Sequence, residues 1–115
     1  MTQPSDVLLV FTQLPDREAA ENLARALIEE RVAACVNILA AGTSIYRWQG
    51  KVEHASEIPL LIKTTAARYD ALEAVIRRLH PYELPEVAAV PLAQGLPDYL
   101  QWVADEVRGE VNVGT

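Results

Sequence analysis

The sequence is poor in cysteine and in basic residues. Its 115 residues include one cysteine, so no disulfide can form within the chain. Ten Lys and Arg stand against sixteen Asp and Glu, giving a net charge of -6. This balance argues against binding to nucleic acid or to an anionic membrane surface. No uninterrupted apolar stretch approaches the ~20 residues that a membrane-spanning helix needs. Because the single cysteine cannot form a disulfide within the chain, we expect a reducing, cytoplasmic location.

Motifs that mark the common enzyme classes are also missing. The chain has five glycines, and none of them forms the Gly-rich loop that cradles a nucleotide phosphate. It contains no Cys-x-x-Cys, no His-Glu-x-x-His and no Gly-x-Ser-x-Gly segment. We therefore expect neither a nucleotide cofactor nor an enzymatic activity.

The sequence does contain a regular succession of apolar segments. Short apolar runs bounded by Gly, Pro or polar residues predict strands, and apolar residues at helical spacing predict helices. The expected strands cover residues 7–11, 32–39, 43–48, 51–65 and 86–92. The expected helices cover residues 16–31, 66–79 and 96–107, with Thr64 or Thr65 as the cap of the second helix.

The order of these segments is β-α-β-β-α-β with a terminal helix, which is the split β-α-β or ferredoxin-like arrangement. We expect an α+β fold in which the helices pack on one face of an antiparallel sheet. Residues 1–108 are expected to form a single domain, and residues 109–115 a disordered tail.

The two central strands are predicted to form an unusually long hairpin. Its arms, residues 32–48 and 51–65, meet at the two-residue turn Gln49-Gly50, and they far exceed the ~5–6 residues of an average strand. The first and fourth strands are too short to pair along the whole hairpin, so its tip is expected to overhang the domain. An unpaired edge favours association, and we expect strand pairing with a neighbouring subunit near residues 45–52.

Two residues with reactive side chains have more than one interpretation. Cys35 lies in an apolar run, where a free thiol is most often a buried core residue; a metal or redox role is the alternative. His80 precedes Pro81 at a predicted helix end, which favours capping or a structural hydrogen bond. With Glu83 and Glu86, His80 also provides imidazole and carboxylate donors that suit a borderline metal such as copper or zinc.

Charged and aromatic residues near the hairpin indicate a second candidate site. Glu57 and Lys63 lie in an otherwise apolar strand, where buried charges must be paired or solvated. They indicate either an inter-subunit ion pair or exposed edge, or a polar pocket between subunits, where small-ligand sites often occur. The candidate pocket at the subunit cleft comprises Cys35, Trp48, Glu57, Lys63 and Tyr82, although a tryptophan such as Trp48 is more often a packing anchor.

Five segments of the chain resemble the CutA divalent-cation tolerance proteins. The similarity keeps its order and spacing from about residue 7 to residue 108, and as a set the segments are specific. They are Glu-Glu-Arg-Val-Ala-Ala-Cys-Val-Asn at 29–37, Ser-Ile-Tyr-Arg-Trp-Gln-Gly-Lys at 44–51, Ile-Lys-Thr at 62–64, His-Pro-Tyr-Glu-Leu-Pro-Glu at 80–86 and Asp-Tyr-Leu-Gln-Trp at 98–102.

The resemblance implies a ferredoxin-like fold, a stable homotrimer in the bacterial cytoplasm, and binding of copper and other divalent cations that is linked to metal tolerance. Because the trimer resembles that of the PII signalling proteins, a small-molecule sensor or scaffold with ligand sites at subunit clefts is the alternative. A purely structural, very stable trimer is a third.

The family places copper ligands on a cysteine at the end of the first strand and on two adjacent histidines. This chain has Phe11 and Leu79 at two of these positions and keeps only His80. A metal at His80 therefore needs carboxylates or symmetry-related copies to complete its coordination shell.

Overall fold

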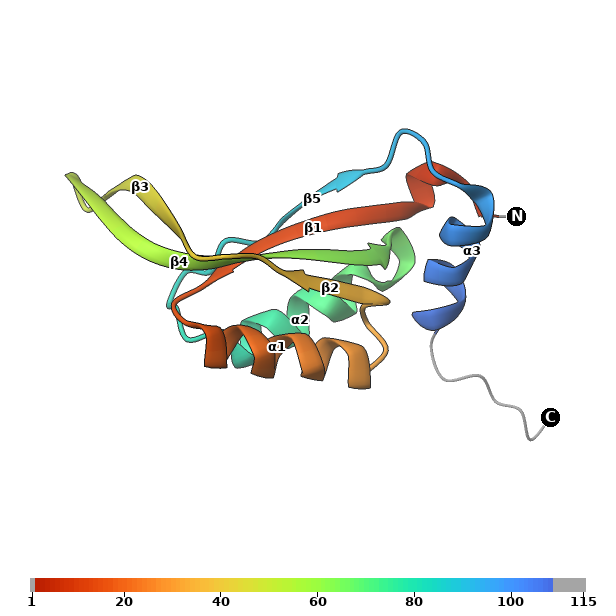
Figure 1. The fold of residues 1–115 in the computed structure, drawn as a ribbon, viewed down its shortest axis with the longest axis horizontal. Helices are drawn as coiled ribbons and strands as arrows, with labels where there is room; N and C mark the ends of the chain where they lie inside the picture. Colours follow the sequence, from red (N-terminus) through yellow and green to blue (C-terminus); the bar gives the residue numbers. More distant parts are fainter. Residues whose placement is uncertain (1, 109–115) are drawn as a thin grey trace.

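The computed structural model describes residues 2–108, and the tail expected at 109–115 lies outside them. Five strands, three α-helices and two 3-10 turns form the described chain (Figure 1). The strands are β1 (Val7–Leu14), β2 (Cys35–Ile38), β3 (Gly42–Trp48), β4 (Lys51–Thr65) and β5 (Ala88–Pro91). The remaining elements are η1 (Pro4–Asp6), α1 (Arg17–Glu29), η2 (Ala66–Arg68), α2 (Tyr69–Leu79) and α3 (Pro97–Glu106). No helix within residues 2–108 has the length and apolar character needed to cross a bilayer.

The strands form an antiparallel sheet with β4 at its centre. The order is β2-β4-β1-β5, and β3 pairs with the part of β4 nearest the hairpin turn. Helices α1 and α2 lie together on one face of the sheet, and α3 packs at the end of the sheet away from the hairpin (Figure 1). The expected α+β, ferredoxin-like architecture is therefore confirmed, and of the three helices α1 and α2 share one face of the sheet as expected.

Alternation along the strands decides which side chains contact α1 and α2. Val10, Leu60 and Ile62 point from neighbouring strands into the main core, where they meet Leu27 and Ile76 of the two helices. All five side chains are almost completely buried. A smaller cluster joins α3 to the first residue of β1 and consists of Val7, Leu100 and Val103.

The bounds of the first two strands differ from the expectation. β1 runs on to Leu14, because this residue still pairs with Ile58 of β4. β2 begins at Cys35 rather than at residue 32. The N–H groups of Val32 and Ala33 bond back to a carbonyl of α1 and complete the turn that ends this helix.

The second helix and the last strand also begin later than expected. The α-helix starts at Tyr69, after the 3-10 turn η2. Neither threonine acts as the expected cap, since Thr65 makes no side-chain cap hydrogen bond and the Thr64 hydroxyl donates to the Val32 carbonyl at 2.7 Å. β5 begins only at Ala88, where pairing with β1 begins.

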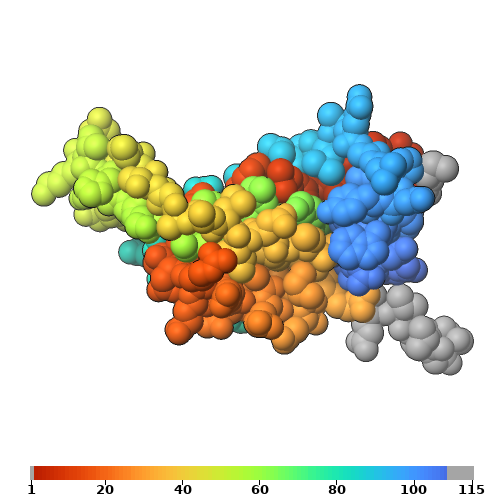
Figure 2. All heavy atoms as spheres, viewed as in Figure 1, coloured from red at the N-terminus to blue at the C-terminus, as the bar shows by residue number. Residues whose placement is uncertain are grey.

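The β3–β4 hairpin extends beyond the body of the protein, as its length predicts. The turn residues Gln49 and Gly50 have φ angles of 50° and 81°, the left-handed conformation that a type I′ turn requires at both positions. β3 pairs with β4 as far as Glu57, whereas β1 reaches β4 only at Ile58. Within the described chain no third strand pairs with the tip, and Figure 2 shows the hairpin projecting from the rest of the molecule.

Candidate functional site

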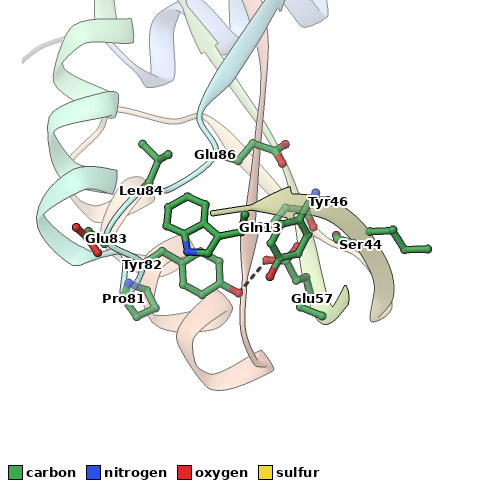
Figure 3. A pocket seen from close by; sticks show the side chains of 12 residues that line it. Gln13, Ser44, Tyr46, Glu57, Pro81, Tyr82, Glu83, Leu84 and Glu86 are labelled. Carbon is green, nitrogen blue, oxygen red and sulfur yellow. Dashed lines mark hydrogen bonds between the residues drawn. The ribbon is translucent and has the colours of Figure 1, made fainter. Parts of the chain in front are cut away.

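A cavity of about 880 Å³ lies at the base of the β3–β4 hairpin. This volume is within the ~300–1,000 Å³ range of small-molecule sites. Its walls come from β1, β3, β4 and the segment between α2 and β5 (Figure 3). The lining residues are Gln13, Ser44, Ile45, Tyr46, Trp48, Ala55, Glu57, Pro81, Tyr82, Glu83, Leu84 and Glu86.

The hairpin supplies aromatic rings to the cavity. Ser44, Tyr46 and Trp48 alternate along β3 and therefore share one face of the strand. All three line the cavity, and the two aromatic side chains remain about two-fifths exposed. Their faces are therefore partly available to a bound molecule.

Glu57 lies deep in the cavity wall and is hydrogen-bonded to Tyr82. Only 9% of Glu57 is exposed, and its Oε2 atom accepts a 2.8 Å hydrogen bond from the Tyr82 hydroxyl (Figure 3). The pKa of Tyr82 is raised to about 12, chiefly by burial and to a smaller extent by this hydrogen bond and the negative charge of Glu57. The phenol therefore stays protonated at neutral pH and acts as a hydrogen-bond donor.

His80 holds the segment that carries Tyr82 in place. Its Nδ1 atom accepts a 3.1 Å hydrogen bond from the Tyr82 backbone N–H. The proton consequently resides on Nε2, which donates to the Gln13 carbonyl at 2.6 Å. Burial lowers the pKa of His80, against the opposing effects of the Gln13 bond and the Glu57 charge. The imidazole is neutral, and both of its nitrogens are engaged within the fold.

The lining of the cavity is acidic. Glu57, Glu83 and Glu86 face a site that no Lys, Arg or His lines. The ion pairs of residues 2–108 lie elsewhere and join Arg78 to Glu30 and Arg108 to Asp105. The negative charge of the cavity is therefore not neutralised by a direct ion pair in the described chain.

The structure brings together three of the five residues predicted for a subunit-cleft pocket. Trp48, Glu57 and Tyr82 line the same cavity. Cys35 and Lys63 lie outside this lining and pair with each other in the β2–β4 register. The Lys63 ammonium donates to the Asn37 side chain on the same face of the sheet. That these five residues meet between subunits stays a prediction.

Cys35 is not the buried core residue that its apolar run indicated. It is only half-buried, because alternation along β2 turns Val36 and Ile38 toward the helices and Cys35 to the opposite face. The thiol lies close enough to the Tyr99 phenol to add to the rise in pKa that burial produces there.

The predicted metal ligands do not form a coordination shell in one chain. Glu83 and Glu86 line the cavity, whereas His80 does not. Across residues 2–108, no group of three or more His, Cys, Asp or Glu side chains is close enough to hold a metal ion. The donors that residues 2–108 of one chain provide therefore do not fit a tightly bound copper ion.

Sequence reasoning missed several cavity residues, notably Gln13, Tyr46 and Leu84. Tyr46 could have been inferred, because it is two residues from Trp48 on one strand. Gln13 could not, because its place depends on β1 continuing past residue 11. The exposed Leu84 has no periodic pattern that marks it as part of a site.

These observations place the protein in the class of α+β, ferredoxin-like domains. Its antiparallel sheet is extended by a long hairpin, with an acidic and aromatic cavity at the base of the hairpin. The chain belongs to the CutA1 divalent ion tolerance protein family, whose model matches residues 8–106.

Individual relatives agree with this assignment. The Divalent-cation tolerance protein CutA of Thermus thermophilus is 46% identical over 84% of this chain and 94% of its own length. The crystal structure of CutA from Xylella fastidiosa is 49% identical, with a TM-score of 0.88 over 90% of this chain and all of that one. Mouse Protein CutA is 44% identical over 97% of this chain. The chain spans 63% of the mouse relative and 56% of the human one.

Proposed function

We propose that this protein is a cytoplasmic homotrimer that binds divalent metal ions, copper among them, and acts in divalent-cation tolerance as a binding protein rather than an enzyme. The observation that carries the proposal is the family match over residues 8–106. The name of the relative from Thermus thermophilus, which this chain covers almost end to end, also points to divalent-cation tolerance.

Two surfaces support assembly into a trimer. The β3–β4 tip leaves strand edges without a partner in the described chain, and such edges favour pairing with another chain. The sheet face opposite α1 and α2 carries Lys63 and Asn37, but it also leaves apolar side chains incompletely covered: Leu9, Phe11 and Leu61 are half-buried, and Val90 is 45% exposed. Burying this face against other copies stabilises the assembly by the hydrophobic effect.

The distribution of metal donors favours a site between subunits. Glu83 and Glu86 are exposed carboxylates, and carboxylate oxygens bind divalent cations. One chain supplies no group of three donors within residues 2–108. We infer that donors from a neighbouring copy complete the shell around Glu83 and Glu86, with His80 contributing only if its bond from the Tyr82 N–H is given up.

Light scattering and copper calorimetry test the two parts of this proposal. The wild-type protein at micromolar concentration should have three times the mass of one chain and should bind copper to saturation. The double variant Glu83→Gln, Glu86→Gln should lose most of the copper affinity. The matched control Glu21→Gln, Glu29→Gln alters exposed carboxylates of α1 and should retain it. A monomeric protein, or equal copper affinity in both double variants, would contradict the proposal.

The cavity favours a second candidate function, a PII-like trimeric sensor or scaffold that binds a small molecule. Its volume of about 880 Å³ suits such a ligand. Its deeply buried Glu57 and its partly exposed aromatic rings are typical of the few polar groups and many apolar contacts that fix a ligand in place. A thermal-shift screen of small molecules in the presence of EDTA separates this function from metal binding.

A further inference from the structure

Glu57 is a largely buried residue whose carboxylate has no positive partner within residues 2–108. It is 9% exposed, and one of its oxygens accepts a bond from Tyr82, yet Glu57 forms no ion pair within residues 2–108. Burial of a carboxylate is costly unless an opposite charge or several hydrogen bonds compensate it. The Tyr82 hydroxyl supplies one hydrogen bond and no charge, so a cation in the cavity would stabilise this arrangement.

Aromatic side chains stand beside this carboxylate. Tyr46, Trp48 and Tyr82 line the same cavity, and Figure 3 shows the Tyr82 hydroxyl directed at the Glu57 carboxylate. The faces of such rings attract ammonium groups and also bury apolar carbon. Basic residues are absent from the lining, so nothing there competes for the anionic and aromatic surfaces.

Within one chain, the features around Glu57 suit an organic cation better than a metal ion. A divalent metal needs several oxygen or nitrogen donors converging on one point, and residues 2–108 hold no such group. An ammonium group on an apolar body needs one carboxylate, a few ring faces and a cavity of suitable size. The lining residues of one chain provide all of these.

We propose that the cavity at the base of the β3–β4 hairpin binds a small protonated amine with an aromatic or apolar body. The ammonium group donates to Glu57, and the body packs against Tyr46 and Trp48. This inference deepens the second candidate function and rests on it, and it concerns the part of the cavity around Glu57 rather than Glu83 and Glu86, the carboxylates at which the metal is proposed.

Tryptophan fluorescence offers a direct test. In a Trp102→Phe background, Trp48 is the remaining indole, and it lines the cavity. Three probes of similar shape are titrated in EDTA, namely 2-phenylethylammonium, neutral 2-phenylethanol and anionic 3-phenylpropanoate. We expect saturable binding of the ammonium probe, about tenfold tighter than that of the alcohol, which corresponds to ~1.4 kcal/mol. The anion should not bind.

Single variants then test whether Glu57 holds the ammonium group of the probe and whether the aromatic rings contribute to its binding. Glu57→Gln preserves the shape and an acceptor for Tyr82, and it should weaken the ammonium probe about tenfold or more while leaving the alcohol unchanged. Tyr46→Leu, at an exposed ring, should weaken the ammonium probe about threefold or more. Glu29→Gln is the control and should change nothing.

Any of three results would overturn the proposal. These are equal affinity for the ammonium probe and the alcohol, unchanged binding of the ammonium probe in Glu57→Gln, and no saturation at millimolar concentrations of 2-phenylethylammonium. None of these results bears on copper binding or on trimer mass, which are measured separately without EDTA. Failure of the amine site and failure of the metal proposal are therefore distinguishable. Failure of the amine site also differs from failure of the second candidate function, because the thermal-shift screen in EDTA covers small molecules that are not amines.

Discussion

Replacing His80 with alanine should destabilise the protein strongly, because the imidazole connects two separate parts of the chain. The ring is 8% exposed. It donates to the Gln13 carbonyl at 2.6 Å and accepts from the Tyr82 N–H at 3.1 Å. The His80→Ala variant removes both bonds and leaves a backbone acceptor and a backbone donor without their partner.

The magnitude follows from those two groups. A buried polar group left without its partner costs ~1–3 kcal/mol, so two such groups cost ~2–6 kcal/mol. Because both bonds are only partly buried, His80→Ala should lower the free energy of unfolding by an amount in the lower part of this range, about 2–4 kcal/mol. For a chain of this size the midpoint of thermal unfolding should fall by about 8–16 °C. The exposed His54 provides the control, since His54→Ala should change stability by less than ~0.5 kcal/mol.

The contribution of His80 should also depend on pH. Because burial lowers its pKa in the folded chain, the unfolded chain binds a proton first as the pH falls below ~6.5. Protonation then favours unfolding, so stability decreases with acidification from ~6.5 down through the folded pKa. The difference in stability between wild type and His80→Ala should therefore be largest near neutral pH and shrink toward pH 5.

Guanidinium unfolding at one fixed protein concentration, at pH 7.5 and pH 5, measures these effects without confusion from subunit dissociation. A loss below 1 kcal/mol for His80→Ala, equal to that of His54→Ala, would refute the reasoning. A difference that grows as the pH falls would refute the pH dependence, because it would mean that the folded state favours the charged ring.

Three further predictions concern other parts of the structure. Gly50→Ala should destabilise by about 1–2 kcal/mol because φ is 81° there, whereas Gly42→Ala, which meets no atom within 4 Å, should cost less in the same thermal melt. Leu72→Ala, at a fully buried core position, should cost about 2–5 kcal/mol in guanidinium unfolding. Glu57→Gln should lower the pKa of Tyr82 from about 12 toward that of an ordinary phenol, because a negatively charged acceptor is removed. A spectrophotometric titration measures this pKa, and an unchanged value would show that burial alone raises it.

The sequence predicted the fold well because its signals are local and repeated. Apolar periodicity located α1 and α2 to within a few residues, and the two-residue turn at Gln49-Gly50 was confirmed with both residues in the left-handed region. The overhang of the hairpin followed from strand lengths, and the register of β4 with β1 and β3 confirms it. Element ends were less certain, because pairing with a distant strand extends β1 and a helix-ending turn shortens β2.

The candidate site was predicted only in part, because its geometry depends on contacts between distant segments. Trp48, Glu57 and Tyr82 were chosen for their residue types, and the fold brings them to one cavity. Lys63 was chosen on the same grounds, yet it lies with Asn37 on the open face of the sheet. Nothing in the sequence near His80 shows that its two nitrogens are satisfied by Gln13 and Tyr82.

Native mass spectrometry with increasing copper tests the central claim most directly, because one spectrum reports both assembly and bound metal. The account predicts a single species of three chains of 12.7 kDa each, whose mass increases in discrete copper steps and then stops increasing. A species of one chain, or copper addition that continues without saturation and is unaffected by Glu83→Gln, Glu86→Gln, would contradict it.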